Sequence, residues 1–357
     1  MNKRLELLGL ILLILLTSCK NEPVEQKANE QKVQSPNSYQ TIGVIEKFDP
    51  LLDEIINPKA KIEVLGKGMV WSEGPLWLPE EKALICSDVK ENRIFKWTEK
   101  TGLVPFLEPS GFTGESTDSR ERGSNGLTLN PAGKLVLCHH GDRRVAQYLG
   151  DFQNPKPLFK TITESFEGKK FNSPNDLIYD SQGNLYFTDP PFGLSEEMME
   201  DPKKELSFQG VYKFTPEGTL HVLTKEMSRP NGLALSPDES ILYVSNTDGK
   251  QAIWMAFPLT ADRMLGPGKI LHDATHLIGK EVGYPDGIKV DRNGNIFTAG
   301  PGGLWIFDPQ GKVLGKIKPG QWVSNCNFDD TGKVLFITAD DYPVSYTHLT
   351  LPTIYSV

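Results

Sequence analysis

A short sequence pattern recurs six times between residues 73 and 338. A clear copy consists of a residue with a side-chain oxygen, an apolar run, a turn that contains Asp, Asn or Ser and usually Gly, and a second apolar run. Four copies are clear, and the first and the last are degenerate. Such turn residues supply local hydrogen bonds and tolerate positive φ, so each copy predicts a β-hairpin. The copies begin at Glu73, Asn125, Asn175, Asn231, Asp286 and Ser324.

Further strand-like runs lie between the copies, among them Arg93 to Trp97, Gly210 to Phe214 and Gly303 to Phe307. Four short strands in a unit of about 40–55 residues, with no helical periodicity, are typical of one propeller blade. Six copies therefore predict an all-β fold, a six-bladed β-propeller. A β-sandwich or a barrel is the alternative, but neither explains the repeat.

The segments outside the repeat complete the predicted layout. Lys3 and Arg4 precede a ten-residue apolar run, which is too short to span a bilayer as a helix, and residues 1–19 read as a signal peptide. Residues 20–40 are rich in Glu, Gln, Lys, Asn and Ser and predict a disordered tether. The propeller is expected over 41–342. Residues 343–357 do not read as a pair of propeller strands and are set apart as a doubtful C-terminal tail.

The end of the signal segment, Leu16-Thr17-Ser18-Cys19, resembles a bacterial lipoprotein signal in which the Cys is lipidated. Lys20 follows instead of the Asp that would favour retention at the inner membrane. We therefore expect a periplasm-facing lipoprotein of the cell envelope, at the outer membrane, whose only membrane contact is the lipid anchor. The alternative is an ordinary signal peptide with an incidental Cys.

Charge and cysteine content exclude several kinds of site. The formal net charge is -8 and no basic stripe is present, which argues against a nucleic-acid partner. Cys86, Cys138 and Cys326 lie in or beside apolar runs and are expected to be free and buried. There is no Cys-x-x-Cys pair, so the pattern does not favour a zinc site.

The first residue of each repeat forms a column of oxygen ligands. Equivalent positions of a propeller lie on one ring around its axis, so several carboxylate and amide oxygens should converge at the mouth of the central channel. Ca²⁺ takes six to eight oxygen ligands, which makes it the expected cation; Mg²⁺, Mn²⁺ and Zn²⁺ are alternatives. For any single member the alternative is a turn residue, because Asn beside Gly is common in turns. The column is Glu73, Asn125, Asn175, Asn231, Asp286 and Ser324.

A second column lies at the end of the second apolar run. His139 belongs to it and is followed by His140, and one of the two is expected to face the pocket. Asp88 and Asp189 are expected either to support the ring from behind or to cap strand ends. The column is Asp88, His139, Asp189, Asn246, Gly300 and Ala339.

Several of these motifs resemble the gluconolactonase/regucalcin family, also called the senescence-marker-protein family, over roughly residues 60 to 340. The motifs are Ser72-Glu73-Gly74-Pro75-Leu76-Trp77, Ser173-Pro174-Asn175-Asp176-Leu177, Tyr186-Phe187-Thr188-Asp189-Pro190, Arg229-Pro230-Asn231-Gly232-Leu233-Ala234 and Tyr284-Pro285-Asp286-Gly287.

The resemblance implies specific roles for the ring. Glu73, Asn231 and Asp286 would ligate the metal, and Asn175 would contact metal or substrate. Asp286 would also be the proton donor and acceptor, and Asn125 would orient the substrate. One departure concerns specificity, because animal sugar-lactonase members carry Arg where this chain has Ser173.

These observations predict a Ca²⁺-dependent hydrolase of a small lactone or ester. Asp286 is the first candidate for the proton-transfer residue and His140, or His139, the second. There is no Gly-x-Ser-x-Gly motif, so a serine nucleophile is not expected. The polar loops from Leu107 to Gly123 and from Pro190 to Gln209 are candidate lids. The main alternative is a non-catalytic, calcium-stabilised propeller that binds carbohydrate or protein. A third is an enzyme of different chemistry, such as a phosphotriesterase or a carbon–carbon bond-forming propeller.

Overall fold

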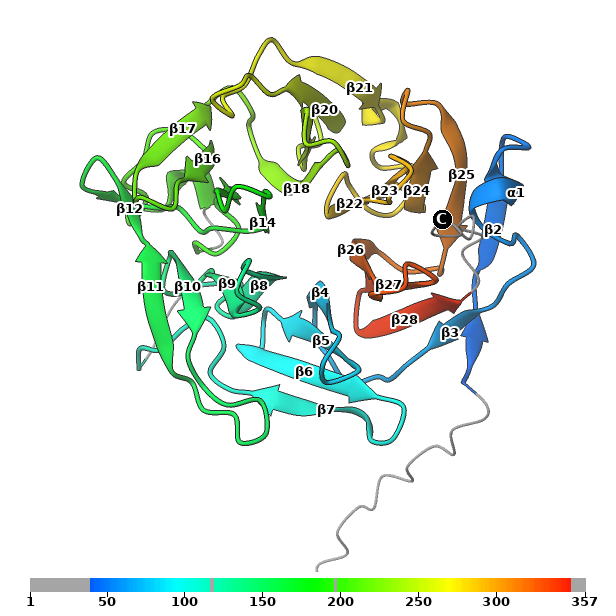
Figure 1. The fold of residues 1–357 in the computed structure, drawn as a ribbon, viewed down its shortest axis with the longest axis horizontal. Coiled ribbons are helices and arrows are strands. Elements are labelled where there is room, and N and C mark those ends of the chain that lie inside the picture. Colours follow the sequence, from blue (N-terminus) through cyan, green and yellow to red (C-terminus); the bar gives the residue numbers. More distant parts are fainter. Residues whose placement is uncertain (1–38, 116–118, 196–197, 348–357) are drawn as a thin grey trace, which may run out of the picture. The chain divides into compact units, whose positions relative to one another are not determined.

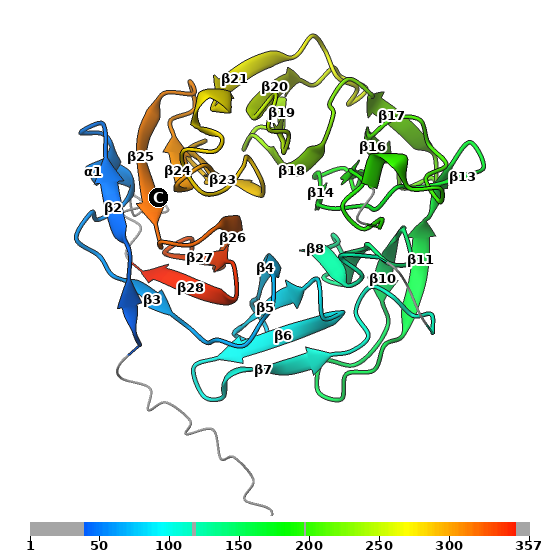
Figure 2. The same ribbon diagram turned by 180° about the vertical axis from the view of Figure 1, so that it is seen from behind.

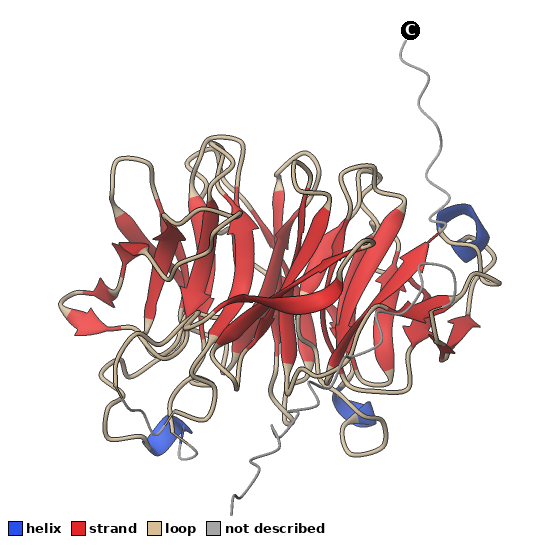
Figure 3. Cartoon of the chain, turned by 90° about the horizontal axis from the view of Figure 1, so that it is seen from below, coloured by secondary structure: helices blue, strands red, loops and turns tan. Residues whose placement is uncertain are grey.

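Six large antiparallel sheets surround a central axis (Figure 1). The computed structural model describes residues 39–115, 119–195 and 198–347. Each sheet has its innermost strand beside the axis, and the strands run between two layers of loops (Figure 3). The prediction of an all-β, six-bladed propeller is therefore confirmed. Among the described residues, no helix is long and apolar enough to cross a bilayer.

Blades one to four are each built from consecutive strands, in the order inner to outer. Blade one consists of β4 (Ser72–Leu78), β5 (Ala83–Asp88), β6 (Arg93–Thr98) and β7 (Gly102–Leu107). Blade two consists of β8 (Ser124–Leu129), β9 (Leu135–His139), β10 (Arg144–Tyr148) and β11 (Phe159–Thr163). Blade three consists of β14 (Leu177–Tyr179), β15 (Leu185–Asp189), β16 (Gly210–Phe214) and β17 (Leu220–Thr224). Blade four consists of β18 (Pro230–Leu235), β19 (Ile241–Asn246), β20 (Ile253–Pro258) and β21 (Lys269–Asp273).

Blades five and six combine the two ends of the described chain (Figure 2). In blade five, β2 (Val44–Lys47) adds to β22 (Ile288–Val290), β23 (Ile296–Gly300), β24 (Gly303–Phe307) and β25 (Val313–Lys318). In blade six, β3 (Ile62–Val64) and β1 (Thr41–Ile42) follow β26 (Val323–Phe328), β27 (Val334–Ala339) and β28 (Tyr342–Thr347). The remaining elements are α1 (Leu52–Ile55), the hairpin β12 (Ser165–Phe166) and β13 (Lys169–Lys170), and the 3₁₀ turns η1 (Met198–Glu200) and η2 (Thr275–Leu277).

This closure corrects the predicted boundaries. The segment after residue 342 is not a separate tail, because Tyr342–Thr347 forms β28, which pairs with β27 and β3. The outer strands of blade six come from the N-terminal side of the chain. Residues 39 and 40, assigned above to the tether, also contact the propeller: the rings of Tyr39 and Trp97 are 6.4 Å apart, and Gln40 O accepts a hydrogen bond from Val64 N. The signal segment 1–19 and the rest of the tether lie outside the described residues.

A turn held by an Asp side chain explains why the repeat folds as a hairpin in blades three and five. In blade three, Asp180 Oδ1 accepts hydrogen bonds from the backbone N–H groups of Gln182 and Asn184, while Gly183 adopts a φ of +85°. Blade five repeats this arrangement around Asp291. In both turns the Asp side chain accepts hydrogen bonds from residues two and four positions later in the chain. The turn is therefore encoded locally in the sequence.

Apolar side chains of the strands pack between neighbouring blades. Leu76 and Ile85 of blade one share a buried cluster with Leu127 and Leu137 of blade two. Between blades four and five, Trp254 packs on Trp305 and Phe307. This packing fixes each innermost strand relative to its neighbours, and so fixes the residues at the mouth of the channel.

Candidate active site at the mouth of the channel

A pocket of about 680 Å³ opens where the innermost strands begin. Five members of the predicted ring line it, one from each of blades one to five: Glu73, Asn125, Asn175, Asn231 and Asp286. The structure therefore brings together five of the six residues in the predicted column. The other lining residues are Trp71, Lys90, Arg120, Glu121, Phe192, Met198, Arg229, Thr247, Tyr284 and Trp322.

Hydroxyl groups hold the backbone of the ring from one blade to the next. Ser87 Oγ donates to Asn125 O at 2.8 Å, and Thr188 Oγ1 donates to Asn231 O at 2.7 Å. Ser245 Oγ donates to Asp286 O at 2.6 Å. These hydroxyls lie on the second strand of the preceding blade and are buried. Asn125, Asn231 and Asp286 are therefore positioned by the preceding blade as well as by their own chain segments.

The glycine that follows a ring residue makes room for the next blade. A Cβ on Gly126 would lie 2.7 Å from Asn175 O, and a Cβ on Gly232 would clash with Asp286 O. Both contacts are with backbone atoms, which cannot move away cheaply. The recurring Asn-Gly and Asp-Gly pairs thus reflect the close approach of the blades around the axis, and not hairpin turns.

Hydrogen bonds orient the polar ends of the ring side chains. Asn231 Nδ2 donates to Thr247 Oγ1 at 2.9 Å, which leaves the amide oxygen for a ligand. Glu73 Oε2 accepts from Gly74 N at 3.1 Å and from Asn325 Nδ2 at 3.4 Å. Within the described part of the chain, Asn125 Oδ1 and Asp286 Oδ1 are buried without a hydrogen-bond partner.

Burial of the two ring carboxylates makes their ionised forms costly. Burial, together with the nearby carboxylates of Asp176 and Glu121, raises the pKa of Glu73 to about 8. Burial also raises the pKa of Asp286 well above its usual range, and the charge of Glu73 contributes. A bound cation would remove this cost, because it would stabilise both ionised carboxylates.

The donor set of the ring fits a hard cation. The described residues contain no cluster of three or more His, Cys, Asp or Glu side chains that could hold a metal. A cation here would therefore depend on the amide oxygens of Asn231 and Asn175 as well as on the Glu73 and Asp286 carboxylates. An all-oxygen set of this kind suits Ca²⁺ better than Zn²⁺, which prefers nitrogen and sulfur.

Residues 71–340 match the family model described as the SMP-30/Gluconolactonase/LRE-like region. The chain belongs to this SMP-30/gluconolactonase family. The resemblance inferred from the motifs is thereby confirmed.

Similar proteins match most of the chain. A gluconolactonase of Zymomonas mobilis is 40% identical over 307 residues, which are 84% of each protein. Lactonase drp35 of Staphylococcus epidermidis is 28% identical over 269 residues, 72% of this chain and 70% of that protein. A solved gluconolactonase structure from Xanthomonas campestris has a TM-score of 0.73 and 29% identity, and the match covers 87% of this chain and 97% of that one.

The two adjacent histidines of this SMP-30/gluconolactonase chain are buried beside the pocket and do not line it. His139 Nδ1 lies 3.3 Å from Asp142 Oδ2 and from Arg144 Nε, and its ring packs edge-on against Phe159. His140 Nδ1 lies 3.5 Å from Glu121 Oε2, and Glu121 does line the pocket. The Glu121 side chain therefore lies between His140 and the pocket. This differs from the expectation that one of the two histidines would face the pocket directly.

Ser324, the sixth member of the predicted column, is not part of the pocket. Its hydroxyl donates to Ser72 O at 2.6 Å and lies 2.7 Å from Thr338 Oγ1. The short side chain of Ser324 makes these hydrogen bonds and does not reach the pocket. Blade six instead contributes Asn325, whose amide donates to Glu73.

In the second column, the carboxylates of Asp88 and Asp189 cap backbone N–H groups. Asp88 accepts hydrogen bonds from Val70 N and Trp71 N, and Asp189 accepts from Asn172 N and Ser173 N. Burial raises the pKa of Asp189 to about 7. These carboxylates hold the chain just before the ring residue and so position the side chains at the rim.

The two predicted lid loops both reach the pocket. Arg120 and Glu121 come from the first, and Phe192 and Met198 from the second. The sequence did not predict these four residues individually, nor the aromatic residues Trp71, Tyr284 and Trp322 that also line the pocket. The charged triplet Arg120-Glu121-Arg122 inside a loop rich in Gly and Ser was the available signal for the first pair.

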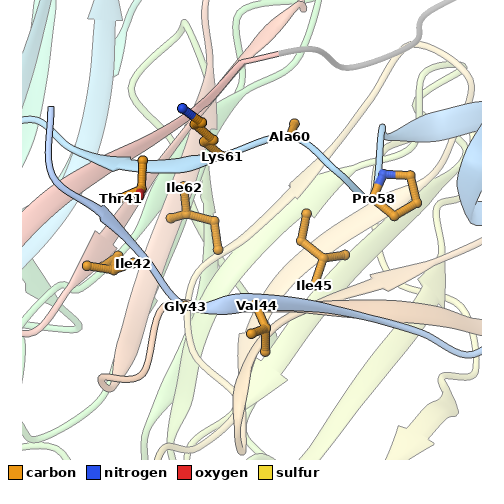
Figure 4. Close-up of a pocket in the computed structure, with 9 residues that line it drawn as sticks. All are labelled: Thr41, Ile42, Gly43, Val44, Ile45, Pro58, Ala60, Lys61 and Ile62. Atoms are coloured by element: carbon orange, nitrogen blue, oxygen red, sulfur yellow. The ribbon is translucent and has the colours of Figure 1, made fainter. Parts of the chain in front are cut away.

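A second cavity of about 450 Å³ lies at the outer edge, along β1, β2 and the segment before β3 (Figure 4). Lys61 is the one charged side chain among the described residues that line it. This cavity offers no carboxylate or imidazole for catalysis, so the pocket at the channel is the candidate active site.

Proposed function

We propose that this chain hydrolyses small lactones, sugar lactones in particular, with the help of a divalent cation, Ca²⁺ in the first place. The observation that carries the proposal is the convergence of two buried carboxylates and several amide groups from five blades on one pocket, with Asn125 Oδ1 and Asp286 Oδ1 buried and unpartnered within the described residues. The relatives named gluconolactonase and lactonase support the same reaction.

Glu73, Asn231 and Asp286 would hold the cation, and Asn175 would contact the cation or the substrate. When bound, the cation would polarise the lactone carbonyl and stabilise the oxyanion that develops on it. Mg²⁺, Mn²⁺ and Zn²⁺ are alternatives to Ca²⁺, and Zn²⁺ is the least suited to this all-oxygen set. Asn125 would orient the substrate through its amide.

The rim of the pocket supports a sugar-like substrate. Trp71 and Tyr284 each pack against Trp322, with ring centroids 5.5 Å and 5.3 Å apart. Their faces form an apolar wall, while Trp322 Nε1 is a buried donor without a partner among the described residues. Ser173, which stands where animal members carry Arg, donates its hydroxyl to Pro190 O and does not line the pocket. Substrate recognition here would therefore differ from that of the animal enzymes.

We also infer the location of the protein from its N-terminal sequence. Residues 1–38 lie outside the described residues, and the motif ending in Cys19 supports a lipid-anchored protein of the cell envelope that faces the periplasm. A Cys19→Ser variant should then leave the membrane fraction or stay unprocessed. Normal processing and unchanged membrane fractionation of that variant would argue against a lipid anchor.

A hydrolysis panel tests the proposed activity. Purified protein would be assayed with D-glucono-1,5-lactone, γ-butyrolactone and p-nitrophenyl acetate, with and without a chelator. We expect chelator-sensitive hydrolysis of the sugar lactone, its loss in Asp286→Asn, and wild-type rates in the matched control Asp262→Asn, which changes an exposed carboxylate outside the pocket. Sugar binding without hydrolysis of any substrate would instead favour the non-catalytic propeller, which the enzyme names of the relatives do not support.

A further inference from the structure

Glu121 is a third carboxylate in the pocket, and it belongs to neither predicted column. It lies between β7 and β8 and is 8% exposed. Its Oε1 accepts a hydrogen bond from Arg120 Nη2 at 3.1 Å. Glu121 lines the same pocket as the ring, and its charge contributes to the raised pKa of both Glu73 and Asp286.

His140 lies directly behind Glu121. Its side chain is fully buried, and neither ring nitrogen has a hydrogen-bond partner among the described residues. Nδ1 is 3.5 Å from Glu121 Oε2, which is slightly too long for a hydrogen bond but close enough to become one after a small movement of the carboxylate. A buried imidazole with two unsatisfied nitrogens is costly, so its position needs a reason beyond packing.

The surrounding backbone holds this pair in place. His140 N donates to Gly123 O, and Arg120 N donates to Leu194 O, which ties the first lid loop to the second. Gly193 lies against the imidazole, because a Cβ at that position would be 2.6 Å from His140 Cβ. Glu121 therefore lies between the His140 imidazole and the pocket, and the two connected loops hold it in this position.

We propose that Glu121, and not Asp286, is the carboxylate that takes the proton from the attacking water, and that His140 is the positioning residue that orients it. This inference rests on the proposed lactone hydrolysis. Asp286 would be committed to the cation, and a cation lowers the basicity of a carboxylate that it binds. Glu121 stands outside the ring yet lines the same pocket. The charged or titratable groups that face it are Arg120, His140, Glu73 and Asp286.

In the proposed hydrolysis, Glu121 accepts a proton in the first step and returns it in the second. Water forms a bond to the lactone carbonyl carbon while one of its protons moves to the Glu121 carboxylate. The tetrahedral intermediate then breaks the bond between that carbon and the ring oxygen. The ring oxygen takes the proton back from Glu121, which gives an open-chain hydroxy acid and restores the carboxylate.

The test compares Glu121→Gln and His140→Asn with matched controls. Glu108→Gln makes the same chemical change in an exposed residue of the same loop, which pairs with Arg93. His139→Asn removes the adjacent buried imidazole. Steady-state kinetics with D-glucono-1,5-lactone over a range of pH would be combined with Ca²⁺ calorimetry and far-UV circular dichroism on every variant.

We expect Glu121→Gln to bind Ca²⁺ like the wild type while kcat falls on the order of 10²-fold or more. Glu121→Asp should recover part of that loss. His140→Asn should lower kcat without raising KM and should shift the acid limb of the kcat profile, whereas His139→Asn should leave that limb in place. Glu108→Gln should behave like the wild type.

Two results would overturn the assignment. If Glu121→Gln keeps kcat within about threefold while Asp286→Asn is inactive, the proposed function stands and Glu121 is not the proton acceptor. If the folded wild-type protein hydrolyses no lactone, the proposed function fails and the role of Glu121 fails with it.

Discussion

Replacing Glu73 by Gln should stabilise the metal-free protein at high pH and leave its stability at pH 4 nearly unchanged. Burial, together with the charges of Asp176 and Glu121, raises the pKa of Glu73 from its ordinary value of 4.5 to about 8. Between these values the folded protein holds a proton that the unfolded chain has released, so wild-type stability falls as the pH rises. At 1.36 kcal/mol per pKa unit, the loss amounts to about 5 kcal/mol above pH 8. Gln is neutral and nearly isosteric, so the variant escapes this loss.

Urea unfolding of chelator-treated protein at pH 4.5, 7 and 9 measures this effect. The free energy of unfolding of the Glu73→Gln variant should exceed that of the wild type by a few kcal/mol at pH 9, and the gap should close toward pH 4.5. Glu80→Gln, which changes an exposed carboxylate, is the control and should follow the wild type. Parallel pH curves for the wild type and Glu73→Gln would refute the argument that burial destabilises the ionised carboxylate.

Three further predictions follow from the ring and the closure. Asn231→Ala should lose Ca²⁺ binding in calorimetry while keeping the β-sheet circular dichroism spectrum, and normal affinity would remove Asn231 from the site. Gly232→Ala should cost about 1–3 kcal/mol of stability and weaken Ca²⁺ binding, because the new Cβ would push on Asp286 O; an unchanged urea midpoint would contradict the close approach of the blades. A chain that starts at residue 39 should melt like the full-length protein, whereas one that starts at residue 48, without β1 and β2, should melt several degrees lower; equal melting temperatures would mean that these strands add nothing.

The blades could be predicted from the sequence because their signals are local. A turn such as Asp180 to Gly183 and the two apolar runs beside it lie within about 15 residues, and the repeat presents that signal several times. The closure of blade six has no such signal. Pairing of β28 with β3 joins Val344 to Val64, and nothing near either residue marks the other as its partner.

The ring could be predicted for a related reason, since symmetry places equivalent residues together. Ser324 shows the limit of that argument: it has the right place in the repeat, but its short side chain bonds to Ser72 O and Thr338 instead. Glu121 could not be predicted because its loop follows no repeat. His140 was expected in the pocket, but the packing of the two loops places it behind Glu121.

The dependence of activity on the amount of cation tests the central claim most directly. Chelator-treated, dialysed protein would be titrated with Ca²⁺ while hydrolysis of D-glucono-1,5-lactone is followed by proton release at constant pH, with the spontaneous rate subtracted. We predict negligible enzymatic hydrolysis without added cation and a rate that saturates when one cation is bound per chain. Full activity in the cation-free protein, or activity that does not respond to any divalent cation, would contradict the assignment of the ring as a catalytic cation site.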